Sequence, residues 1–246
     1  MMNHPYPIMV NLSGRKCLVV GGGQVAERKV LSLLQAGAHV TVVSTEFTAE
    51  LAEMENRSEV VLNRQPFQPA IITDECPKEG PYTLIVAATN DADINVQVYE
   101  LASRQGRLVN VVDQPQLSSF ILPSVVRRGK LVIAVSTGGA SPSAARNIAQ
   151  ELDNVYGEEY ACYLEFLSDI RLLVQSKVAD KPARQKMFKE ILEWDVLAKI
   201  REGTFESWKE MLYIALEKEP WMHEQAGEEV TDQIAWPVIK DFGQRV

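Results

Sequence analysis

Residues 16–26 read KCLVVGGGQVA, and this stretch decides the fold class. The segment 16–21 is apolar after its first residue, which is typical of a strand buried on both faces of a parallel sheet. A helix is predicted to follow over 24–35, and Gly37 just beyond it is suited to end that helix. The stretch therefore predicts a buried strand that passes through a glycine turn into a helix.

The glycine turn matches the pattern GxGxxA between a predicted strand and a predicted helix. In this pattern Gly21 permits the tight turn, Gly23 lets the backbone approach a pyrophosphate, and the small Ala26 lets the helix pack on the strand. The start of the helix adds free N–H groups and a positive dipole for phosphates. A glycine-rich turn that only connects two elements is the alternative. The predicted dinucleotide-binding residues are Gly21, Gly23, Gln24, Val25 and Ala26, with Ser44, Thr45, Thr89 and Asn90 at the ends of later strands.

The choice between NAD and NADP depends on the end of the second predicted strand, 39–44. About 20 residues beyond such a glycine turn, Rossmann-type sites have an Asp or Glu that binds the ribose, but Ser44-Thr45 stand there in this chain. No arginine follows Ser44 directly to pair with a 2′-phosphate. The fingerprint leaves the choice open, and the missing arginine favours NAD.

The first half of the chain alternates apolar strands with helices, which is typical of a doubly wound α/β sheet. Asp91 is a good N-cap for a helix that ends near residue 103. In contrast, 65–81 holds four prolines and is predicted as a loop with at most a short helix. The predicted strands are 16–21, 39–44, 60–64, 82–89 and 108–113.

The pattern changes after residue 113. Residues 125–135 read VVRRGKLVIAV and predict a hairpin, and Ser141-Pro142 predicts the start of a helix that runs to about residue 156. Amphipathic helices follow from about residue 158. We predict an α/β Rossmann-type parallel sheet, then a hairpin and helix segment, then a small all-helical domain. The predicted boundaries are 1–122, 123–156, 157–226 and a poorly ordered tail, 227–246.

Composition excludes several classes of protein. The chain of 246 residues is 46% hydrophobic and 24% charged, as globular proteins are, and its net charge of −8 argues against a general nucleic-acid binder. No apolar run reaches the roughly 18 to 20 residues that span a bilayer, so we expect no membrane partner and a cytoplasmic location. The cysteines and histidines are scattered and predict neither a disulfide framework nor a metal site; they are Cys17, Cys76, Cys162, His4, His39 and His223.

The acidic excess is unevenly distributed. Residues 1–156 hold 13 basic and 15 acidic side chains, residues 157–246 hold 12 and 18, and the basic window 114–150 holds no Asp or Glu at all. Within it, the loop 136–141 offers hydroxyls and backbone N–H groups to an anion. A solvated hairpin tip beside an ordinary capped helix is the alternative. The residues predicted to bind a substrate with several carboxylates are Arg127, Arg128, Lys130, Ser136, Thr137, Gly138, Ser141 and Arg146.

Asp113 ends an apolar strand and precedes Gln114-Pro115. Ligands of open parallel sheets bind beyond the carboxyl ends of the strands, so this carboxylate is expected in the crevice near the nicotinamide end of a bound cofactor. There it can accept a proton when a substrate loses hydride. An aspartate that only bonds to the backbone of its own turn is the alternative.

Four stretches together resemble precorrin-2 dehydrogenase, the free-standing form of the N-terminal module of siroheme synthase. The resemblance extends in order from about residue 6 to about residue 219, and the tail beyond Pro220 is not covered. In combination these motifs are far more specific than GxGxxA alone. They are YPIMVNLSGRKCLVVGGGQVAERK at 6–29, VAATND at 86–91, VNVVDQPQLSSFILPS at 109–124 and VSTGGASPSAAR at 135–146.

The resemblance implies NAD-dependent oxidation of precorrin-2 to sirohydrochlorin in siroheme synthesis, by a homodimer in which 123–156 is the dimerisation segment. It places Asp113 at the position of the family's catalytic carboxylate, and the eight carboxylates of precorrin-2 suit the basic window. Two alternatives remain: an enzyme that also inserts ferrous iron, a step that otherwise falls to a separate chelatase, and a non-catalytic NAD-binding module. Because histidines are so few, we favour the dehydrogenase alone.

Overall fold

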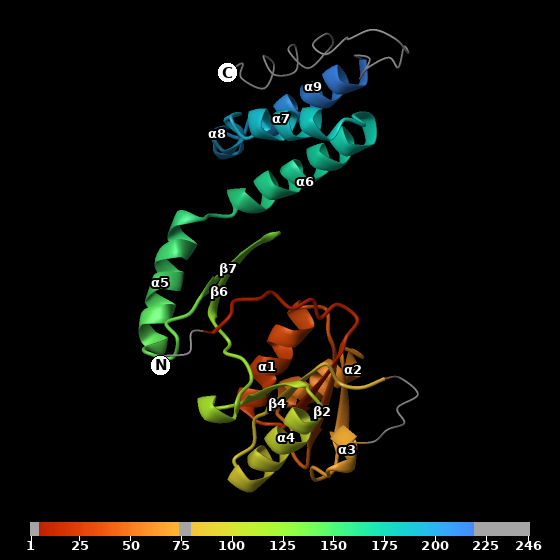
Figure 1. Cartoon of the computed structure of the whole chain (residues 1–246), viewed down its shortest axis with the longest axis vertical. Coiled ribbons are helices and arrows are strands. Elements are labelled where there is room, and N and C mark those ends of the chain that lie inside the picture. Colours follow the sequence, from red (N-terminus) through yellow and green to blue (C-terminus); the bar gives the residue numbers. More distant parts are fainter. Residues whose placement is uncertain (1–4, 74–79, 219–246) are drawn as a thin grey trace. The chain divides into compact units, whose positions relative to one another are not determined.

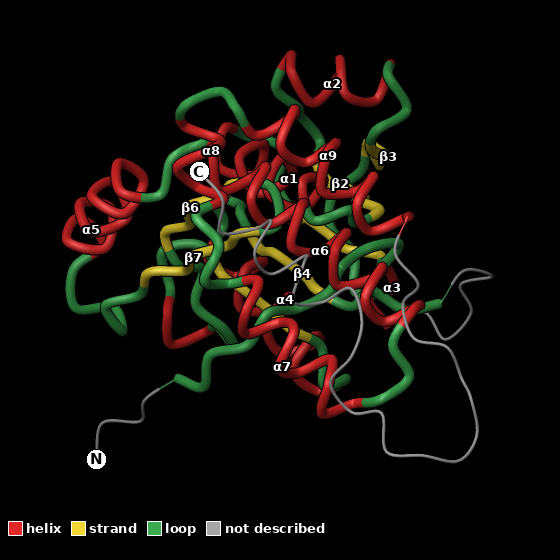
Figure 2. The backbone as a smooth tube through the Cα atoms, turned by 90° about the horizontal axis from the view of Figure 1, so that it is seen from above, coloured by secondary structure: helices red, strands yellow, loops and turns green. Residues whose placement is uncertain are grey.

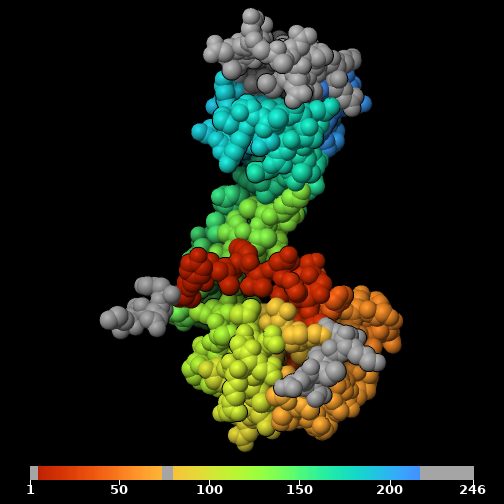
Figure 3. All heavy atoms as spheres, turned by 45° about the vertical axis from the view of Figure 1, so that its right-hand side comes forward, coloured from red at the N-terminus to blue at the C-terminus, as the bar shows by residue number. Residues whose placement is uncertain are grey.

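A computed structural model of the chain describes residues 5–73 and 80–218 (Figure 1). The chain divides after Leu122 into two compact units, and each contains a hydrophobic core of its own. The segment that leads to the first strand lies at the surface, red in Figure 3, and leaves the side chains of Tyr6, Ile8 and Met9 exposed. Within the described ranges, no helix is both long enough and apolar enough to cross a bilayer.

Five parallel strands form the sheet of the first unit: β1 (Lys16–Val20), β2 (His39–Ser44), β3 (Val60–Arg64), β4 (Leu84–Ala87) and β5 (Leu108–Val111). Their order is β3-β2-β1-β4-β5. The register pairs Val20 of β1 with Val43 of β2 and with Ala87 of β4, so the carboxyl ends of these strands lie level. The strand order reverses between β1 and β4, and open α/β sheets bind ligands at this switch point.

Four helices cover the two faces of this sheet: α1 (Gln24–Gln35), α2 (Ala49–Asn56), α3 (Ala70–Thr73) and α4 (Ala92–Arg104). Val30 of α1 and Met54 of α2 share a core with Val19 on one face. On the other face, Val98 of α4 packs with Leu18. Neighbouring residues of β1 therefore enter separate cores, which explains why its sequence is continuously apolar.

The second unit begins with a hairpin and a helix: β6 (Ser124–Arg128), β7 (Leu131–Val135) and α5 (Pro142–Val155). The two strands pair antiparallel, and Gly129 supplies the positive φ that their turn requires. Helix α5 packs beside the hairpin and buries Ala145 and Ala149 (Figures 1 and 2). The hydroxyl of Ser141 caps α5 by accepting the N–H of Ala144.

The rest of the described second unit is helical: α6 (Glu159–Lys177), α7 (Lys181–Ile191), α8 (Val196–Arg201) and α9 (Phe205–Lys218). These helices share a core centred on Phe166, Trp194 and Trp208. The rings of Phe166 and Trp194 each meet that of Trp208 edge to face, with centroids 5.5 Å and 5.9 Å apart. Aromatic pairs favour this geometry, so the cluster joins α6, α9 and the segment between α7 and α8, where Trp194 lies, through specific contacts.

The structure confirms the predicted fold class, with its parallel sheet, hairpin and helical part. The predicted strands 82–89 and 108–113 are shorter in the structure: β4 covers Leu84–Ala87, and β5 ends at Val111 because a turn begins at Val112. The helix α2 was not predicted, because its eight residues include only Leu51 and Met54 as large apolar side chains. The prediction for 227–246 lies outside the described residues.

Candidate functional site

Two glycines let the turn after β1 fit between the ends of its neighbouring strands. Gly21 has φ +122°, and a Cβ added there would overlap the carbonyl oxygen of Ala88, just beyond β4. At Gly22 an added Cβ would overlap the carbonyl oxygen of Glu46 and come within 2.9 Å of Cβ of Ser44. Gly21 thus makes the tight turn expected of it. Gly22, which the motif leaves unspecified, is required because no side chain fits there.

Gly23, in contrast, faces open space at the start of α1. A Cβ added there would meet no heavy atom within 4 Å, and its φ of −84° is one that any residue adopts. No side chain caps α1, so the N–H groups of Gln24, Val25 and Ala26 are available to an anion. A dinucleotide pyrophosphate needs this close approach to backbone, and the residues present fit it.

Asn95 of α4 holds the loop that follows β4. Only 4% of this residue is exposed, and its Oδ1 lies 2.8 Å from Oγ1 of Thr89. Its Nδ2 donates to the carbonyl of Thr89 at 3.0 Å. Asp91 caps α4 by accepting two N–H groups of the first turn. These bonds fix Thr89 and Asn90 at the carboxyl edge of the sheet. Asn95 was missed, since its position looks like any other on a helix.

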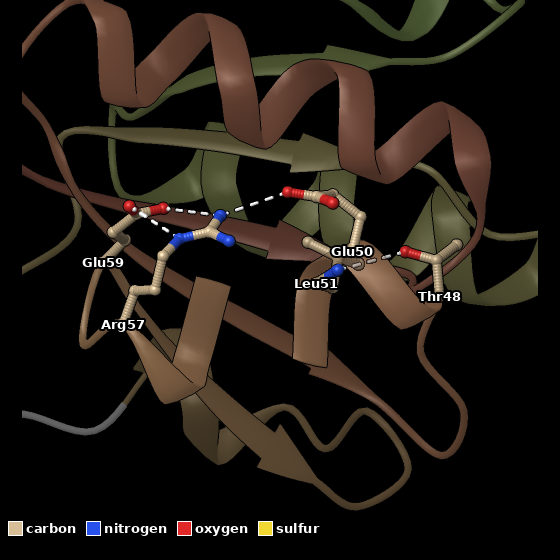
Figure 4. A network of polar contacts seen from close by, with 5 residues as sticks. All are labelled: Thr48, Glu50, Leu51, Arg57 and Glu59. Carbon is tan, nitrogen blue, oxygen red and sulfur yellow. Dashed lines mark hydrogen bonds and ion pairs between the residues drawn. The ribbon is translucent and has the colours of Figure 1, made fainter. Parts of the chain in front are cut away.

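The turn after β2 is bonded to the glycine turn. The N–H of Thr48 donates to the carbonyl of Gly22 at 3.0 Å, and its Oγ1 accepts the N–H of Leu51 at 3.3 Å, which caps α2 (Figure 4). The hydroxyl of Ser44 accepts the N–H of Glu46 at 3.3 Å. Glu46 is exposed and lies two residues beyond Ser44, the end of β2, in the region from which Rossmann-type sites supply an acidic residue to the ribose.

A bridge of charged side chains fixes the crossover between β2 and β3. The guanidinium of Arg57 donates to Glu59 at 3.0 Å and to Glu50 at 3.1 Å, as Figure 4 shows. Arg64 pairs with Glu55, and its hydrogen bonds lower the pKa of that carboxyl. These exposed pairs add little stability each. Together they orient α2 and hence the turn that contacts Gly22.

Asp113 follows β5 with φ +59°, a left-handed conformation that aspartate tolerates better than most residues. Strain of this kind is often found at functional sites. Asp113 and Val112 line a pocket of about 380 Å³ with one side of α1, formed by Val25, Arg28, Lys29 and Ser32. Burial lowers the pKa of Lys29, the positive charge of Arg28 lowers it further, and the charge of Asp113 raises it. Neither cation was predicted as a site residue, because both occupy ordinary polar positions of a helix.

Two serines hold the chain that returns from Asp113 along β5. The hydroxyl of Ser118 accepts the N–H of Val111 at 2.9 Å, and that of Ser119 accepts the N–H of Val109 at 2.8 Å. They satisfy N–H groups that an edge strand would otherwise leave unpaired. The loop that presents Asp113 is therefore fixed at both ends.

In the second unit, two cations of the basic window are already paired. Arg128 is 15% exposed; its Nη2 donates to Oδ1 of Asp153 at 2.8 Å, and its Nε lies 3.3 Å from Oε1 of Glu158. Nζ of Lys130 lies 3.2 Å from Oε2 of Glu165. The acidic partners all follow residue 150, the end of the basic window. Arg128 ties the hairpin to the end of α5, and this pairing weakens its candidacy for binding substrate.

The other two cations of the window are less constrained. Arg127 is exposed on β6 and forms no ion pair with any of the described residues. Nη2 of Arg146 donates to the hydroxyl of Ser143, one turn earlier on α5, at 3.1 Å. A neutral partner leaves its charge uncompensated, so Arg127 and Arg146 are the cations of the window best placed to meet an anion.

The loop 136–141 is shaped by two glycines and internal hydrogen bonds. Gly138 and Gly139 have φ of +62° and +88°, and an added Cβ at either would meet only open space. The hydroxyl of Ser136 accepts the N–H of Gly138, and that of Thr137 accepts the N–H of Ser141 at 3.1 Å. The loop therefore presents an open backbone surface beside the start of α5.

No cluster of three His, Cys, Asp or Glu side chains that could hold a metal ion occurs in residues 5–73 or 80–218. Cys17 lies inside β1, and burial raises the pKa of its thiol to about 11. Such a thiol is unreactive at neutral pH. The groups that the described residues offer to a ligand at the edge of the first sheet include backbone N–H groups, hydroxyls, cations and the carboxylates of Asp113 and Glu46.

Comparison with known proteins agrees with this geometry. Residues 8–124 match a family model described as NAD(P)-binding. A solved structure titled SirC, precorrin-2 dehydrogenase, superposes with a TM-score of 0.64 and 31% identity, covering 76% of this chain and 89% of the other. The chain belongs to the precorrin-2 dehydrogenase family.

Longer relatives of this precorrin-2 dehydrogenase family member are siroheme synthases. That of Nitrosococcus oceani is 37% identical over 211 residues, which cover 86% of this chain and 44% of the relative. That of Thioalkalivibrio sulfidiphilus is 36% identical, with 86% and 42% covered. The chain thus spans less than half the length of these curated relatives.

The predicted residues of this precorrin-2 dehydrogenase family member fall into two groups. Those predicted for cofactor and catalysis follow β1, β2, β4 or β5, so they share the carboxyl edge of one sheet; they are Gly21, Gly23, Gln24, Val25, Ala26, Ser44, Thr45, Thr89, Asn90 and Asp113. All those predicted for substrate belong to the second unit. The residues that sequence reasoning missed at the first group are Gly22, Arg28, Lys29, Glu46 and Asn95.

Proposed function

We propose that the chain catalyses the NAD-dependent dehydrogenation of precorrin-2 to sirohydrochlorin, a step of siroheme synthesis, in the cytoplasm. The observation that supports this most is the edge of the first sheet, where a glycine turn suited to a pyrophosphate and the strained Asp113 follow strands of the same sheet. The SirC structure, whose title names this activity, covers most of the chain at 31% identity.

Different residues bind the cofactor and accept the proton. The N–H groups of 24–26 bind the pyrophosphate, and the loop held by Asn95 orients the cofactor along the edge of the sheet. NAD bound by these residues would supply the hydride acceptor. Asp113 accepts the proton that the substrate loses. The loop fixed by Ser118 holds the carboxylate in place for this step. Growing conjugation of the tetrapyrrole favours the product, so the protein mainly positions the ring and supplies a base.

Glu46 supports NAD rather than NADP. Its backbone contacts Gly22 in the glycine turn, and its exposed carboxylate belongs to the turn that follows β2. In Rossmann-type sites an acidic residue from this region accepts a hydrogen bond from the ribose 2′-hydroxyl of NAD, and its negative charge repels the 2′-phosphate of NADP. No Arg or Lys occurs between Ser44 and Arg57 to offset that repulsion.

For the substrate, Arg127, Arg146 and the loop 136–141 are proposed to bind peripheral carboxylates, with smaller parts for Arg128 and Lys130 because acidic partners already engage them. A homodimer is proposed as the working form. The hairpin and α5 leave Val125, Ile148 and Val155 exposed, and these apolar side chains suit a subunit interface. Light scattering of the purified chain tests the dimer.

The decisive experiment incubates the purified chain anaerobically with precorrin-2 and either NAD or NADP. We expect NADH to form together with the absorbance spectrum of sirohydrochlorin, and NADP to be used poorly. Absence of turnover with both cofactors overturns the proposal and leaves a non-catalytic NAD-binding module. Ferrous or cobaltous ion is then added to the product, with and without protein. Faster metal insertion with protein would add chelatase activity; an unchanged rate would leave that step to a separate chelatase.

A further inference from the structure

The pocket beside Asp113 contains more positive than negative charge. Its lining includes Arg28 and Lys29, both from α1, and Asp113 as the single acidic residue. The surrounding unit is acidic, since residues 1–122 hold 9 basic and 13 acidic side chains. A local excess of positive charge within an acidic unit is a feature expected of a site for an anion.

Neither cation is neutralised by a described residue. No carboxylate of the described ranges lies within 4.0 Å of Arg28 or Lys29, whereas Arg57, Arg64 and Arg104 of the same unit all form ion pairs. Asp113 acts on Lys29 electrostatically, from beyond that distance. Two unpaired cations therefore line a pocket whose only acidic group stands apart from them.

The environment of Lys29 disfavours its own charge. Its side chain is half-buried, and both burial and the neighbouring Arg28 lower its pKa. A carboxylate bound between the two cations would relieve the repulsion and stabilise the ammonium. No described residue supplies such a partner, which leaves the charge of Lys29 open to a ligand.

The pocket also adjoins the cofactor residues. Val25 lies in the first turn of α1, among the N–H groups assigned to the pyrophosphate, and its side chain lines the pocket. The opposite wall is the loop of Asp113. An anionic group in this pocket would thus lie next to both the cofactor and the proposed base.

We propose that Arg28 and Lys29 bind a carboxylate side chain of the tetrapyrrole substrate and so position its reacting carbon beside Asp113. This inference rests on the proposed function. Arg28 offers two parallel N–H donors that match a carboxylate, and Lys29 adds a point charge. Both are positioning residues, and Asp113 remains the proton acceptor. A tetrapyrrole with carboxylates around its whole rim can meet these cations and other basic groups at the same time.

The test compares Arg28→Gln and Lys29→Gln with Arg15→Gln. Arg15 is exposed and directly precedes β1, at the amino edge of the sheet, so its replacement makes the same change in charge away from the pocket. Sirohydrochlorin serves as the binding probe, followed by its absorbance, and calorimetry gives the Kd for NAD. We expect each pocket variant to raise the tetrapyrrole Kd and the KM for precorrin-2 about tenfold, with kcat within about threefold. We expect the Kd for NAD to be unchanged in both pocket variants, and all of these constants to be unchanged in Arg15→Gln.

Salt gives a second readout, because ionic strength screens attraction between charges. The tetrapyrrole affinity of the wild type is expected to fall with added salt more steeply than that of either pocket variant. Equal salt dependence in all variants overturns the inference.

The outcomes separate this inference from the proposed function. If the wild type neither binds sirohydrochlorin nor reduces NAD with precorrin-2, the proposed function fails. If the wild type does both and the pocket variants behave like Arg15→Gln, only the role of Arg28 and Lys29 is overturned. Lys29→Met keeps the aliphatic stem and removes the charge. It is expected to unfold at a temperature no lower than that of the wild type while losing affinity; a variant that loses stability with unchanged affinity contradicts the inference.

Discussion

The carboxamide of Asn95 is bonded to Thr89 on both sides, since its Oδ1 lies 2.8 Å from the threonine hydroxyl and its Nδ2 donates to the threonine carbonyl. This pair joins the first turn of α4 to the loop after β4. No other polar residue of the described ranges is as fully buried. Burial makes the bonds strong and their loss costly, because water cannot replace them.

Asn95→Ala is therefore expected to lower the free energy of unfolding by about 1 to 3 kcal/mol, because it leaves buried polar groups of Thr89 without a partner. The KM for NAD is expected to rise as the loop loses its anchor. Urea unfolding followed by circular dichroism, with steady-state kinetics, measures both effects. Gln97→Ala removes an exposed amide from the same helix and is the matched control. If the two variants prove equally stable, Asn95 does not hold this loop.

Substitutions at Gly22 and Gly23 are expected to have opposite effects on stability and on NAD affinity. Gly23→Ala places a methyl group in open space, so its stability should match the wild type, while its affinity for NAD falls about tenfold or more because that space is needed by the pyrophosphate. Gly22→Ala overlaps the carbonyl of Glu46 and is expected to destabilise the fold by about 1 to 3 kcal/mol. Calorimetry with NAD and thermal unfolding separate the two. A Gly23→Ala variant that binds NAD as tightly as the wild type would show that the pyrophosphate lies elsewhere.

The glycine turn could be predicted because its geometry is local. Gly21 and Gly23 act through the conformation and bulk of a few consecutive residues, which spacing alone encodes. Lys29 and Asn95 interact with residues outside their own helices: the charge of Asp113, 84 positions later, acts on Lys29, and Asn95 bonds to Thr89 in the loop before α4. No helical periodicity distinguishes these two from solvated positions.

The basic window also shows that partners distant in the sequence cannot be predicted from a local stretch. The stretch 114–150 holds four cations and no acidic residue, but Asp153 and Glu158 lie just beyond it. Antiparallel return of the chain brings them onto Arg128, 25 and 30 residues away. The charged contacts of α2 likewise extend beyond its own eight residues, to Arg57 and Arg64.

Replacing Glu46 should change cofactor choice. Glu46→Gln removes the negative charge expected near a 2′-phosphate, so the ratio of kcat/KM for NADP to that for NAD should rise about fivefold, as expected for a repulsion of about 1 kcal/mol at a solvated surface. Glu53→Gln makes the same change on the exposed side of α2 and is the control. Binding titrations with both cofactors provide a readout independent of turnover. A ratio that stays at the control value excludes Glu46 as the selectivity residue.

The pair between Glu159 and Arg201 predicts a dependence of stability on pH. The hydrogen bonds from Arg201, 2.8 Å and 3.2 Å long, lower the pKa of the Glu159 carboxyl. A lowered pKa means that the pair stabilises the folded state at pH values above the ordinary glutamate pKa, and that this contribution is lost as pH falls through the lowered value. Arg201→Gln should thus unfold more easily than the wild type at neutral pH and equally easily in strong acid.

Circular dichroism melts of Arg201→Gln across this range measure the convergence. Lys186→Gln, with the same change of charge at an exposed position of α7, should show a small and nearly constant difference from the wild type. A gap between Arg201→Gln and the wild type that persists undiminished below the lowered pKa would mean that Arg201 stabilises the helices by packing instead of by its charge.

Asp113→Asn tests the proposed base without disturbing its loop. Asparagine accepts the φ of +59° as readily as aspartate and has nearly the same shape, so the fold and the Kd for NAD should be unchanged. An amide cannot accept the proton, and kcat with precorrin-2 is expected to fall by about 10² to 10⁴. Asp113→Ala should lose the same activity and also about 1 kcal/mol of stability, because alanine is strained in this conformation.

Comparing the two variants separates the chemical role of the carboxylate from its role in the conformation of the turn. Full activity in Asp113→Asn would assign the proton to another acceptor and leave the aspartate with the role of shaping its turn.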